Sequence, residues 1–314
     1  MDNNEPKVAR KITIAIASYN QARMIGETIE SSLAQTYKNK DIIVLDDCSS
    51  DNSIEVISKY KVKVYKNDFN LGFAYTFNKL IELSSGEYII FMCSDDFFTD
   101  KEVVSDVVKQ FDYNNNIGVV GRHYYQYFDG DKTNPVMTIR RDIYRSSCQP
   151  SGMSFRKKAL VGKKIKNKIF AEIPLLVKDV ISDGWGYAIL PYDTIAARLH
   201  PGPKGNAATN PVYYNVTPRQ SIIANWSEVM GFSYIDFYNF IQVKNRFPEN
   251  LLMEIGTAIK LKPAILFNPI FYVFALLSII IPSKLLSILS KEYRRLIVSK
   301  TCKIIKREHI KWLN

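Results

Sequence analysis

The sequence predicts an α/β protein in which helices flank a mainly parallel β-sheet. Short apolar runs rich in β-branched residues alternate with helical patterns from about residue 11 to residue 110. The runs are continuously apolar, as in parallel strands that are buried on both faces. A polar cluster directly follows three of the runs, at the point where open sheets of this kind bind ligands.

The expected elements follow one another in a regular order. Strands are predicted at Ile12–Ala17, Ile42–Leu45, Val62–Tyr65 and Tyr88–Met92, and helices at Met24–Gln35, from Ile54 to Ser58 and at Phe73–Leu83. Aromatic, basic and Gly/Pro-rich pieces alternate without a clean period from residue 118 to about residue 215, so no element is predicted there. We expect a domain of residues 1–215, a helical segment of residues 216–259 and a tail of residues 260–314.

The basic excess of the chain belongs mostly to this tail. The 314 residues carry 42 basic and 31 acidic side chains, a formal charge of +11, and residues 260–314 alone have eleven Lys/Arg against two Glu. The first 259 residues are therefore nearly neutral, which argues against a nucleic-acid partner. DNA binding through the tail is an alternative, but it leaves the apolar part of the tail without a role.

The tail has the composition of a membrane-associating segment. Residues Pro263 to Ser283 carry no charge, but Asn268-Pro269 interrupts them, so the segment lies between a spanning and an interfacial length. Residues Lys284 to Asn314 have the pattern of a basic amphipathic helix suited to an anionic leaflet. A packed C-terminal helix pair is the alternative. The polar N-terminus lacks a signal-peptide core, so we expect the protein at the cytoplasmic face of a membrane.

The four cysteines do not form a metal or disulfide pattern. Cys48, Cys93, Cys148 and Cys302 are far apart in the sequence, and no CxxC pair is present. They are expected to be buried thiols in a reducing compartment.

The three polar clusters are Ser18-Tyr19-Asn20, Asp46-Asp47 and Ser94-Asp95-Asp96, each just after a strand, and we expect them to converge. The pair Asp95-Asp96 suits a divalent cation, because Mg²⁺ and Mn²⁺ prefer carboxylate oxygen. An ordinary loop cap is the alternative for this pair. A carboxylate of Asp46-Asp47 could accept hydrogen bonds from a base or a ribose hydroxyl.

A turn at Asn70-Leu71-Gly72, followed by Asn78, leads into a predicted helix. Backbone donors at a helix N-terminus favour an anion, although turn chemistry alone also accounts for these residues.

Taken together, these motifs resemble in order and spacing the family-2 glycosyltransferases with the GT-A fold. The resemblance rests on Ser18-Tyr19-Asn20, the run from Ile42 to Asp51, Asn70-Leu71-Gly72 with Asn78, Gly86-Glu87-Tyr88-Ile89, and Asp95-Asp96. No GxGxxG follows the first strand, so a dehydrogenase pattern does not compete. The resemblance implies a GT-A nucleotide-diphospho-sugar transferase fold with a helical, membrane-associating C-terminal extension.

The resemblance also implies roles for single residues. The nucleotide-sugar donor would contact Ala17, Ser18, Tyr19, Asp46, Asp47, Asn70, Gly72, Asn78 and Asp95. Asp96 would bind a divalent metal, Mn²⁺ or Mg²⁺, that neutralises the leaving diphosphate. The segment Ser151-Gly152-Met153 is similar to one that shapes the acceptor side, and His200 would lie near the metal.

One position departs from the family pattern. The family commonly has Glu-Asp where this chain has Glu172-Ile173, and the missing Asp is often the proposed general base. Glu172 is our preferred base, and Asp179 or Asp183 are the alternatives. We therefore expect an inverting, metal-assisted glycosyltransferase of polysaccharide biosynthesis, with a glycan or lipid-linked glycan acceptor. A membrane-anchored protein that binds nucleotide or glycan without turnover is the alternative, and soluble acceptors stay open.

Overall fold

The computed structural model describes residues 9–128, 135–139, 149–166 and 172–199, and single positions at 272, 276, 280, 282 and 285. The chain divides into two compact units. The first contains Met1–Asn167 and Leu176–Asn206, and the second contains Lys168–Leu175 and Ala207–Asn314. His200, the predicted helical segment of residues 216–259 and the predicted boundaries at 215 and 259 lie outside the described residues.

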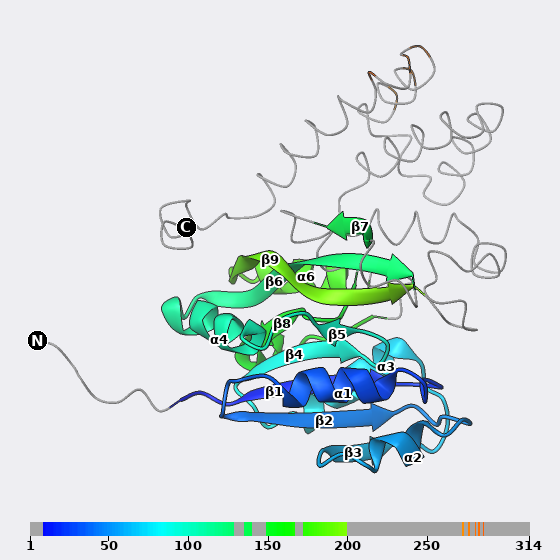
Figure 1. Cartoon of the computed structure of the whole chain (residues 1–314). Helices are drawn as coiled ribbons and strands as arrows, with labels where there is room; N and C mark the ends of the chain where they lie inside the picture. The colour runs from blue at the N-terminus through cyan, green and yellow to red at the C-terminus, as the bar shows by residue number, and fades with distance from the viewer. Residues whose placement is uncertain are drawn as a thin grey trace, which may run out of the picture. The chain divides into compact units, whose positions relative to one another are not determined.

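Nine described strands form one sheet in the order β3-β2-β1-β4-β8-β6-β9-β5, with β7 paired to β6. The strands are β1 (Ile12–Ser18), β2 (Lys40–Asp46), β3 (Lys63–Lys66), β4 (Tyr88–Cys93), β5 (Phe97–Phe98), β6 (Ile117–Phe128), β7 (Pro135–Ile139), β8 (Ser154–Arg156) and β9 (Gly186–Leu199). Strands β1 to β4 pair in parallel, and β6 pairs in parallel with β9. Since β8 is antiparallel to both β4 and β6, all six of these strands run the same way. The predicted mainly parallel sheet is confirmed (Figure 1).

The described helices are α1 (Ile25–Leu33), α2 (Ser53–Ile57), α3 (Phe73–Leu83), α4 (Val103–Tyr113), the 3₁₀ turn η1 (Lys157–Leu160) and α6 (Glu172–Ser182). Helix α3 matches its predicted range, and α1 is shorter than predicted at both ends. Helix α1 lies in front of the strands β1 and β2 in the view of Figure 1. Its buried positions Ile25, Thr28, Ile29 and Ser32 are spaced three and four residues apart, as one helix face requires.

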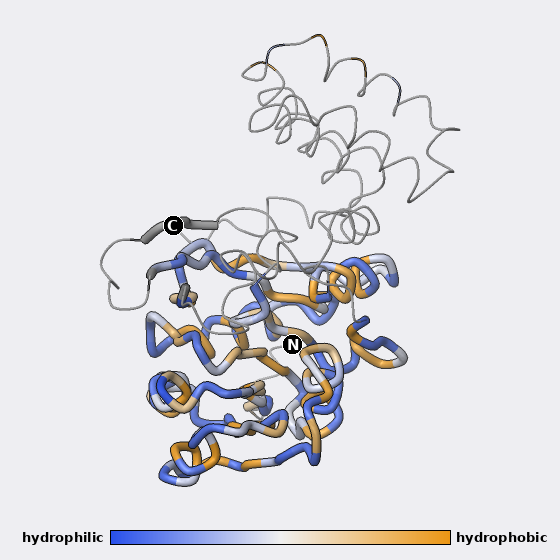
Figure 2. The backbone as a smooth tube through the Cα atoms, turned by 90° about the vertical axis from the view of Figure 1, so that its right-hand side faces the viewer, coloured by the Kyte–Doolittle hydropathy of each residue, from blue (hydrophilic) through white to orange (hydrophobic). Residues whose placement is uncertain are grey.

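The core lies around β1 and β4. The side chains of Ile12, Ile14 and Ile16 are fully buried, as are all residues from Tyr88 to Met92. This burial on both faces explains why the two strands are continuously apolar. Hydrophobic and hydrophilic stretches alternate along the described chain in Figure 2.

The long pair β6–β9 was not predicted, and Pro191 gives one reason. Arg122 pairs with Leu190, but His123 pairs with Asp193, so Pro191 and Tyr192 have no partner on β6. A proline has no N–H to donate to a ladder, and a bulge accommodates it. The proline and the nearby Asp193 interrupt the apolar run, so a search for continuous apolar runs misses the strand.

The second unit is described at few positions. Tyr272, Leu276 and Ile280 are helical, lie four residues apart and expose 51%, 57% and 67% of their surface. Among the described residues, no helix combines the length and the apolar character that crossing a membrane requires.

Candidate functional site

The loops that follow β1, β2 and β4 are hydrogen-bonded to one another. The N–H of Asp47 donates to the carbonyl of Ser18 (2.8 Å), and the N–H of Ser94 donates to the carbonyl of Ala17 (3.1 Å). The N–H of Asn20 donates to the hydroxyl of Ser49 (2.8 Å). The three predicted polar clusters therefore come together at the carboxyl ends of the parallel strands.

Asp46 and Asp47 are buried and shape the neighbouring loops. The carboxylate of Asp46 accepts hydrogen bonds from the N–H (2.8 Å) and the hydroxyl of Ser49. The carboxylate of Asp47 accepts from the N–H groups of Leu71 (2.9 Å) and Gly72 (2.8 Å) and from the amide of Asn67 (2.9 Å). An ionised carboxylate has about four lone-pair positions, so Asp47 keeps room for one further donor.

The predicted anion at the turn Asn70-Leu71-Gly72 is a carboxylate of the protein itself. The N–H groups of the turn bind the Asp47 carboxylate, directly before α3 begins at Phe73. A negative charge near a helix N-terminus is stabilising. Gly72 has φ 84°, in the left-handed region that favours glycine, and a β-carbon there would meet no atom within 4 Å. The conformation, and not crowding, accounts for this glycine.

The Asn78 side chain is hydrogen-bonded to the backbone of Ile165, outside the loops at the strand ends. Its amide group donates to the carbonyl of Ile165 (2.9 Å) and accepts from the N–H of the same residue (2.8 Å). These paired hydrogen bonds hold the segment after η1 against α3. We therefore leave Asn78 out of the donor site proposed below.

Ser18 presents a buried polar group that is not satisfied within the described chain. Its side chain is 2% exposed, and its hydroxyl has no hydrogen-bond partner among the described residues. Buried hydroxyls nearly always have a partner, so a bound ligand is a natural candidate. Its neighbours Ala17 and Tyr19 are partly exposed.

Asp95 and Asp96 form the candidate metal site, together with a thiol that was not predicted. One ligand atom from each of Cys93, Asp95 and Asp96 lies within 4.8 Å of the others. Burial, followed by the charges of Asp95 and Asp96, raises the pKa of the Cys93 thiol well above its usual value. Mg²⁺ and Mn²⁺ prefer carboxylate oxygen to sulfur, so the two carboxylates are the candidate donors.

Asp96 is held by three donors from distant segments. Its carboxylate accepts hydrogen bonds from the Ser151 hydroxyl, the Gln149 amide (2.7 Å) and the N–H of Arg198 (3.0 Å). Only 1% of the residue is exposed, and burial together with the Asp95 charge raises the pKa of its carboxyl. Asp95 is half-buried. Asp96 is thus fixed in orientation, and Asp95 is the more accessible carboxylate.

A buried cation completes this network. The Arg198 guanidinium pairs with Glu27 of α1 and donates to the Tyr127 hydroxyl (2.9 Å). Helix α1 also contacts the metal loop directly, because the Thr28 hydroxyl donates to the Asp96 carbonyl (2.7 Å). Neither contact of α1 could be predicted from local sequence. Glu27 and Arg198 are 171 residues apart in the sequence, and Thr28 and Asp96 are 68 residues apart.

The segment Ser151-Gly152-Met153 lies beside Asp96. Ser151 and Met153 are fully buried, and the Ser151 hydroxyl accepts from the N–H of Cys93 (2.8 Å) while it donates to Asp96. Gly152 has φ 81°, and a β-carbon there would lie 2.6 Å from Ile195 and 2.7 Å from Arg122. This buried segment therefore lies beneath the site, and the Ser151 hydrogen bond fixes the position of the Asp96 carboxylate.

The two alternative bases lie near the amino end of β9, whereas Asp96 lies near its carboxyl end. Asp183 precedes β9, whose first residue Gly186 pairs with Ile117, whereas Arg198 near the end of β9 contacts Asp96. Twelve residues of strand span roughly 40 Å. Asp183 pairs with Lys163, and Asp179, one helical turn earlier, pairs with Lys166 (3.4 Å). Both carboxylates are engaged with lysines, and Glu172, the first residue of α6, stays the predicted base.

Comparison with known proteins identifies relatives for most of this region. Residues 13–178 match the glycosyl transferase family 2 profile. A UDP-Glc:α-D-GlcNAc-diphosphoundecaprenol β-1,3-glucosyltransferase from Escherichia coli, WfaP, is 36% identical over 99 residues, which are 31% of this chain and 39% of that protein. A poly-β-1,6-N-acetyl-D-glucosamine synthase from Staphylococcus aureus is 35% identical over 117 residues, 35% of this chain and 27% of that protein. The matched region thus spans about two fifths or less of these two relatives.

Two solved structures share the fold at low identity. The mannosyltransferase PcManGT from Pyrobaculum calidifontis, in complex with GDP-Man and Mn²⁺, has a TM-score of 0.57 and 13% identity over 88% of this chain and 89% of its own. S. aureus TarS 1–349, in complex with UDP-GlcNAc, has a TM-score of 0.53 and 18% identity over 93% of this chain and 89% of its own.

Proposed function

Because the chain belongs to glycosyl transferase family 2 and has a GT-A-like fold, we propose that it is an inverting, metal-assisted glycosyltransferase. It moves a sugar from a nucleotide-sugar donor to a hydroxyl of a glycan or lipid-linked glycan. The observation that carries the proposal is the pair Asp95-Asp96 at the carboxyl ends of the parallel strands, in which Asp96 is held by three donors from two separate segments.

The residues at this pair fit a hard divalent cation. Mg²⁺ and Mn²⁺ are commonly bound by one or two carboxylates together with substrate phosphates. Asp96 supplies a fixed carboxylate, Asp95 an accessible one, and His200 is a further proposed ligand. When bound, the cation supplies Lewis-acid neutralisation of the donor diphosphate.

The donor site proposed here consists of Ala17, Ser18, Tyr19, Asp46, Asp47, Asn70, Gly72 and Asp95. Two observations support it. The Ser18 hydroxyl is buried without a partner in the described chain, and the Asp47 carboxylate retains one acceptor position. Both groups could form hydrogen bonds with a base or a ribose. The two structural neighbours are in complex with GDP-Man and with UDP-GlcNAc, and each of these ligands contains a base and a ribose.

Glu172 is the proposed general base. Its carboxylate takes the proton of the acceptor hydroxyl while the acceptor oxygen bonds to the anomeric carbon, and the nucleoside diphosphate leaves from the opposite side. Ser151, Gly152 and Met153 form the proposed acceptor side. Ile173, at the position where the family commonly has Asp, is 2% exposed and carries no group that could accept a proton.

We propose that the tail attaches the enzyme to the cytoplasmic face of a membrane. The exposed apolar positions Tyr272, Leu276 and Ile280 repeat every four residues, which is the spacing of one helix face, and Leu285 is 48% exposed. This arrangement suits a lipid-linked acceptor, and WfaP is named for such an acceptor. Recovery of the full-length protein in the soluble fraction without detergent would contradict the attachment.

Turnover by a Glu172→Gln variant tests the mechanism. The full-length protein is incubated with UDP-, GDP- and dTDP-sugars, Mn²⁺ and a lipid-linked glycan acceptor, and nucleoside diphosphate release is measured. We expect Glu172→Gln to abolish transfer and to leave donor affinity nearly unchanged, because the base contacts the acceptor. Asp183→Asn is the matched control and should keep wild-type turnover. If Glu172→Gln transfers sugar at the wild-type rate, Glu172 is not the base.

A further inference from the structure

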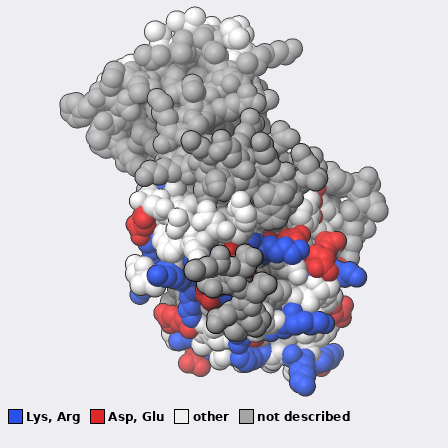
Figure 3. All heavy atoms as spheres, turned by 90° about the vertical axis from the view of Figure 1, so that its left-hand side faces the viewer, with Lys and Arg blue, Asp and Glu red and all other residues white. Residues whose placement is uncertain are grey.

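A basic pocket lies at the amino ends of β2 and β3, opposite to the candidate active site at the carboxyl ends of the parallel strands. It has a volume of about 420 Å³ and is lined by Leu33, Lys38, Lys40, Asp41, Ile42, Lys61, Val62 and Lys63. The walls come from the end of α1, the start of β2 and the segment that enters β3. Figure 3 looks onto this side of the molecule and shows basic side chains, with a few acidic ones among them, over its lower part, where β2 and β3 lie in Figure 1.

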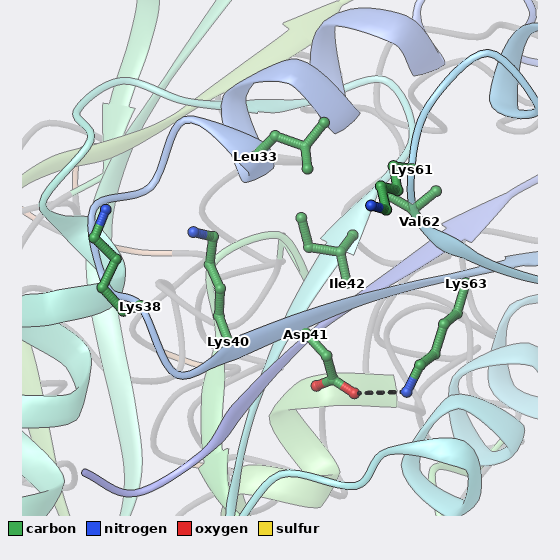
Figure 4. A pocket seen from close by; sticks show the side chains of 8 residues that line it. All are labelled: Leu33, Lys38, Lys40, Asp41, Ile42, Lys61, Val62 and Lys63. Atoms are coloured by element: carbon green, nitrogen blue, oxygen red, sulfur yellow. Dashed lines mark ion pairs between the residues drawn. The ribbon is translucent and has the colours of Figure 1, made fainter.

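The four lysines stand on two sides of an apolar centre. Figure 4 shows Lys38 and Lys40 on one side of Leu33 and Ile42, and Lys61 on the other, next to Val62. A volume of this size is within the range of small-molecule sites, which is roughly 300–1,000 Å³. The pocket therefore combines ammonium groups with an apolar floor.

The one acidic side chain of the pocket is already occupied. The Asp41 carboxylate accepts hydrogen bonds from the hydroxyls of Thr13 (2.6 Å) and Ser85 (2.8 Å), and it pairs with Lys63 (3.5 Å) and Lys11 (3.4 Å). It therefore contributes little towards neutralising the other lysines.

The remaining three lysines keep donors for a ligand. Within the described parts of the chain, Lys38 and Lys61 form no ion pair. The Lys40 ammonium donates to the carbonyls of Gln35 (2.6 Å) and Tyr37 (3.1 Å), which leaves one of its three N–H groups. Burial and, to a lesser extent, the neighbouring Lys38 charge lower the pKa of Lys40, so an anion bound beside it would stabilise its charged form.

Protection of a sheet edge explains only part of this cluster. Lysines on an edge strand prevent pairing with another chain, and Lys63 on β3 fits that role. Lys40 is on β2, which has neighbours on both sides, and Lys38 and Lys61 lie outside the strands. Their convergence on one pocket calls for a different account.

We propose that this pocket binds a small phosphate ester with an apolar portion, at a site separate from the donor site. Lysine ammonium groups bind phosphate as point charges, and Leu33, Ile42 and Val62 would contact the rest of the ligand. Strand β2 separates the two sites, because Lys40 is its first residue and Asp46 its last, a span of roughly 20 Å. The ligand is either a free nucleotide-like phosphate or the headgroup of an anionic phospholipid.

Calorimetric titration of the full-length protein in detergent and EDTA tests the proposal. The probes are inorganic pyrophosphate and glycerol 3-phosphate, the ester that anionic phospholipids carry. We expect the double variant Lys38→Gln/Lys61→Gln to weaken binding at least tenfold, which corresponds to about 1.4 kcal/mol. The matched control Lys158→Gln/Lys164→Gln removes the same charge from exposed positions outside the pocket and should bind as the wild type does.

The two probes distinguish the two sources of phosphate. Tighter binding of pyrophosphate indicates a free phosphate ligand, and tighter binding of glycerol 3-phosphate indicates a lipid headgroup. The proposal is overturned if neither probe binds the wild type, or if both double variants lose affinity equally. Thermal unfolding of each variant checks the fold, which should be kept because Lys38 and Lys61 form no ion pair with a described residue.

Discussion

The Ser151 hydroxyl links the Asp96 carboxylate to β4, and its removal should destabilise the protein strongly. Ser151 is fully buried, donates to Asp96 and accepts from the N–H of Cys93 (2.8 Å). A hydrogen bond to a charged group contributes about 1.5–3 kcal/mol, and a buried N–H left without a partner costs about 1–3 kcal/mol. Since the two terms overlap, we expect Ser151→Ala to lower the free energy of unfolding by roughly 2–4 kcal/mol.

Ser154→Ala is the matched control for this variant. Ser154 is equally buried, but its hydroxyl makes only a neutral hydrogen bond, to the carbonyl of Gly152 at 3.2 Å. We expect that variant to lose about 1 kcal/mol. Urea denaturation in EDTA measures both values. If Ser151→Ala loses no more stability than Ser154→Ala, the Asp96 carboxylate does not depend on Ser151, and the network described here is wrong.

Three further predictions concern the loops around the site. Cys48 has φ 62°, in the left-handed region that glycine tolerates and β-branched residues do not. Cys48→Gly should therefore change the free energy of unfolding by less than about 0.5 kcal/mol, whereas Cys48→Val should lower it by roughly 1–2 kcal/mol. Urea denaturation measures both values. Burial raises the pKa of Asp51, but hydrogen bonds from Ser53 and from the N–H of Ala22 outweigh it and hold the pKa below its usual value. The stabilisation is then present above the unfolded-state pKa near 4 and is lost as the pH falls, so the destabilisation caused by Asp51→Asn at pH 7 should shrink at pH 3. Gly152 and Gly162 both have a positive φ, but only Gly152 is crowded. Gly152→Ala should therefore lower the free energy of unfolding by roughly 2–4 kcal/mol, and Gly162→Ala by about 1 kcal/mol. Equal losses in the two variants would contradict the crowding at Gly152.

The regular first half of the fold could be predicted because its signals are local. The buried strands β1 and β4 are continuous apolar runs, and α3 is bounded by a turn and a serine, so sequence patterns locate them to within about a residue. Strands β6 and β9 escaped prediction because Pro191 and polar residues interrupt their pattern.

In the candidate site, too, only the residues with a local sequence signal could be predicted. The carboxylates could be predicted because each lies at or just after the carboxyl end of a strand. Their partners could not, because the contacts join segments that are far apart in the sequence: Arg198 with Glu27, Gln149 with Asp96, and Asp47 with Gly72. Asn78 fits the family spacing, but its amide bonds to Ile165, a contact that no local pattern reveals.

Donor turnover tests the central claim most directly. Purified full-length protein is incubated with UDP-, GDP- and dTDP-sugars, with Mn²⁺ or with EDTA, and nucleoside diphosphate release is measured alongside the thermal shift that each donor causes. We predict that one donor is both turned over and stabilising with Mn²⁺, and that EDTA or Asp95→Asn abolishes its turnover. If no nucleotide-sugar binds or reacts, or if turnover persists in Asp95→Asn, the carboxylates at the strand ends are not the centre of a sugar-transfer site.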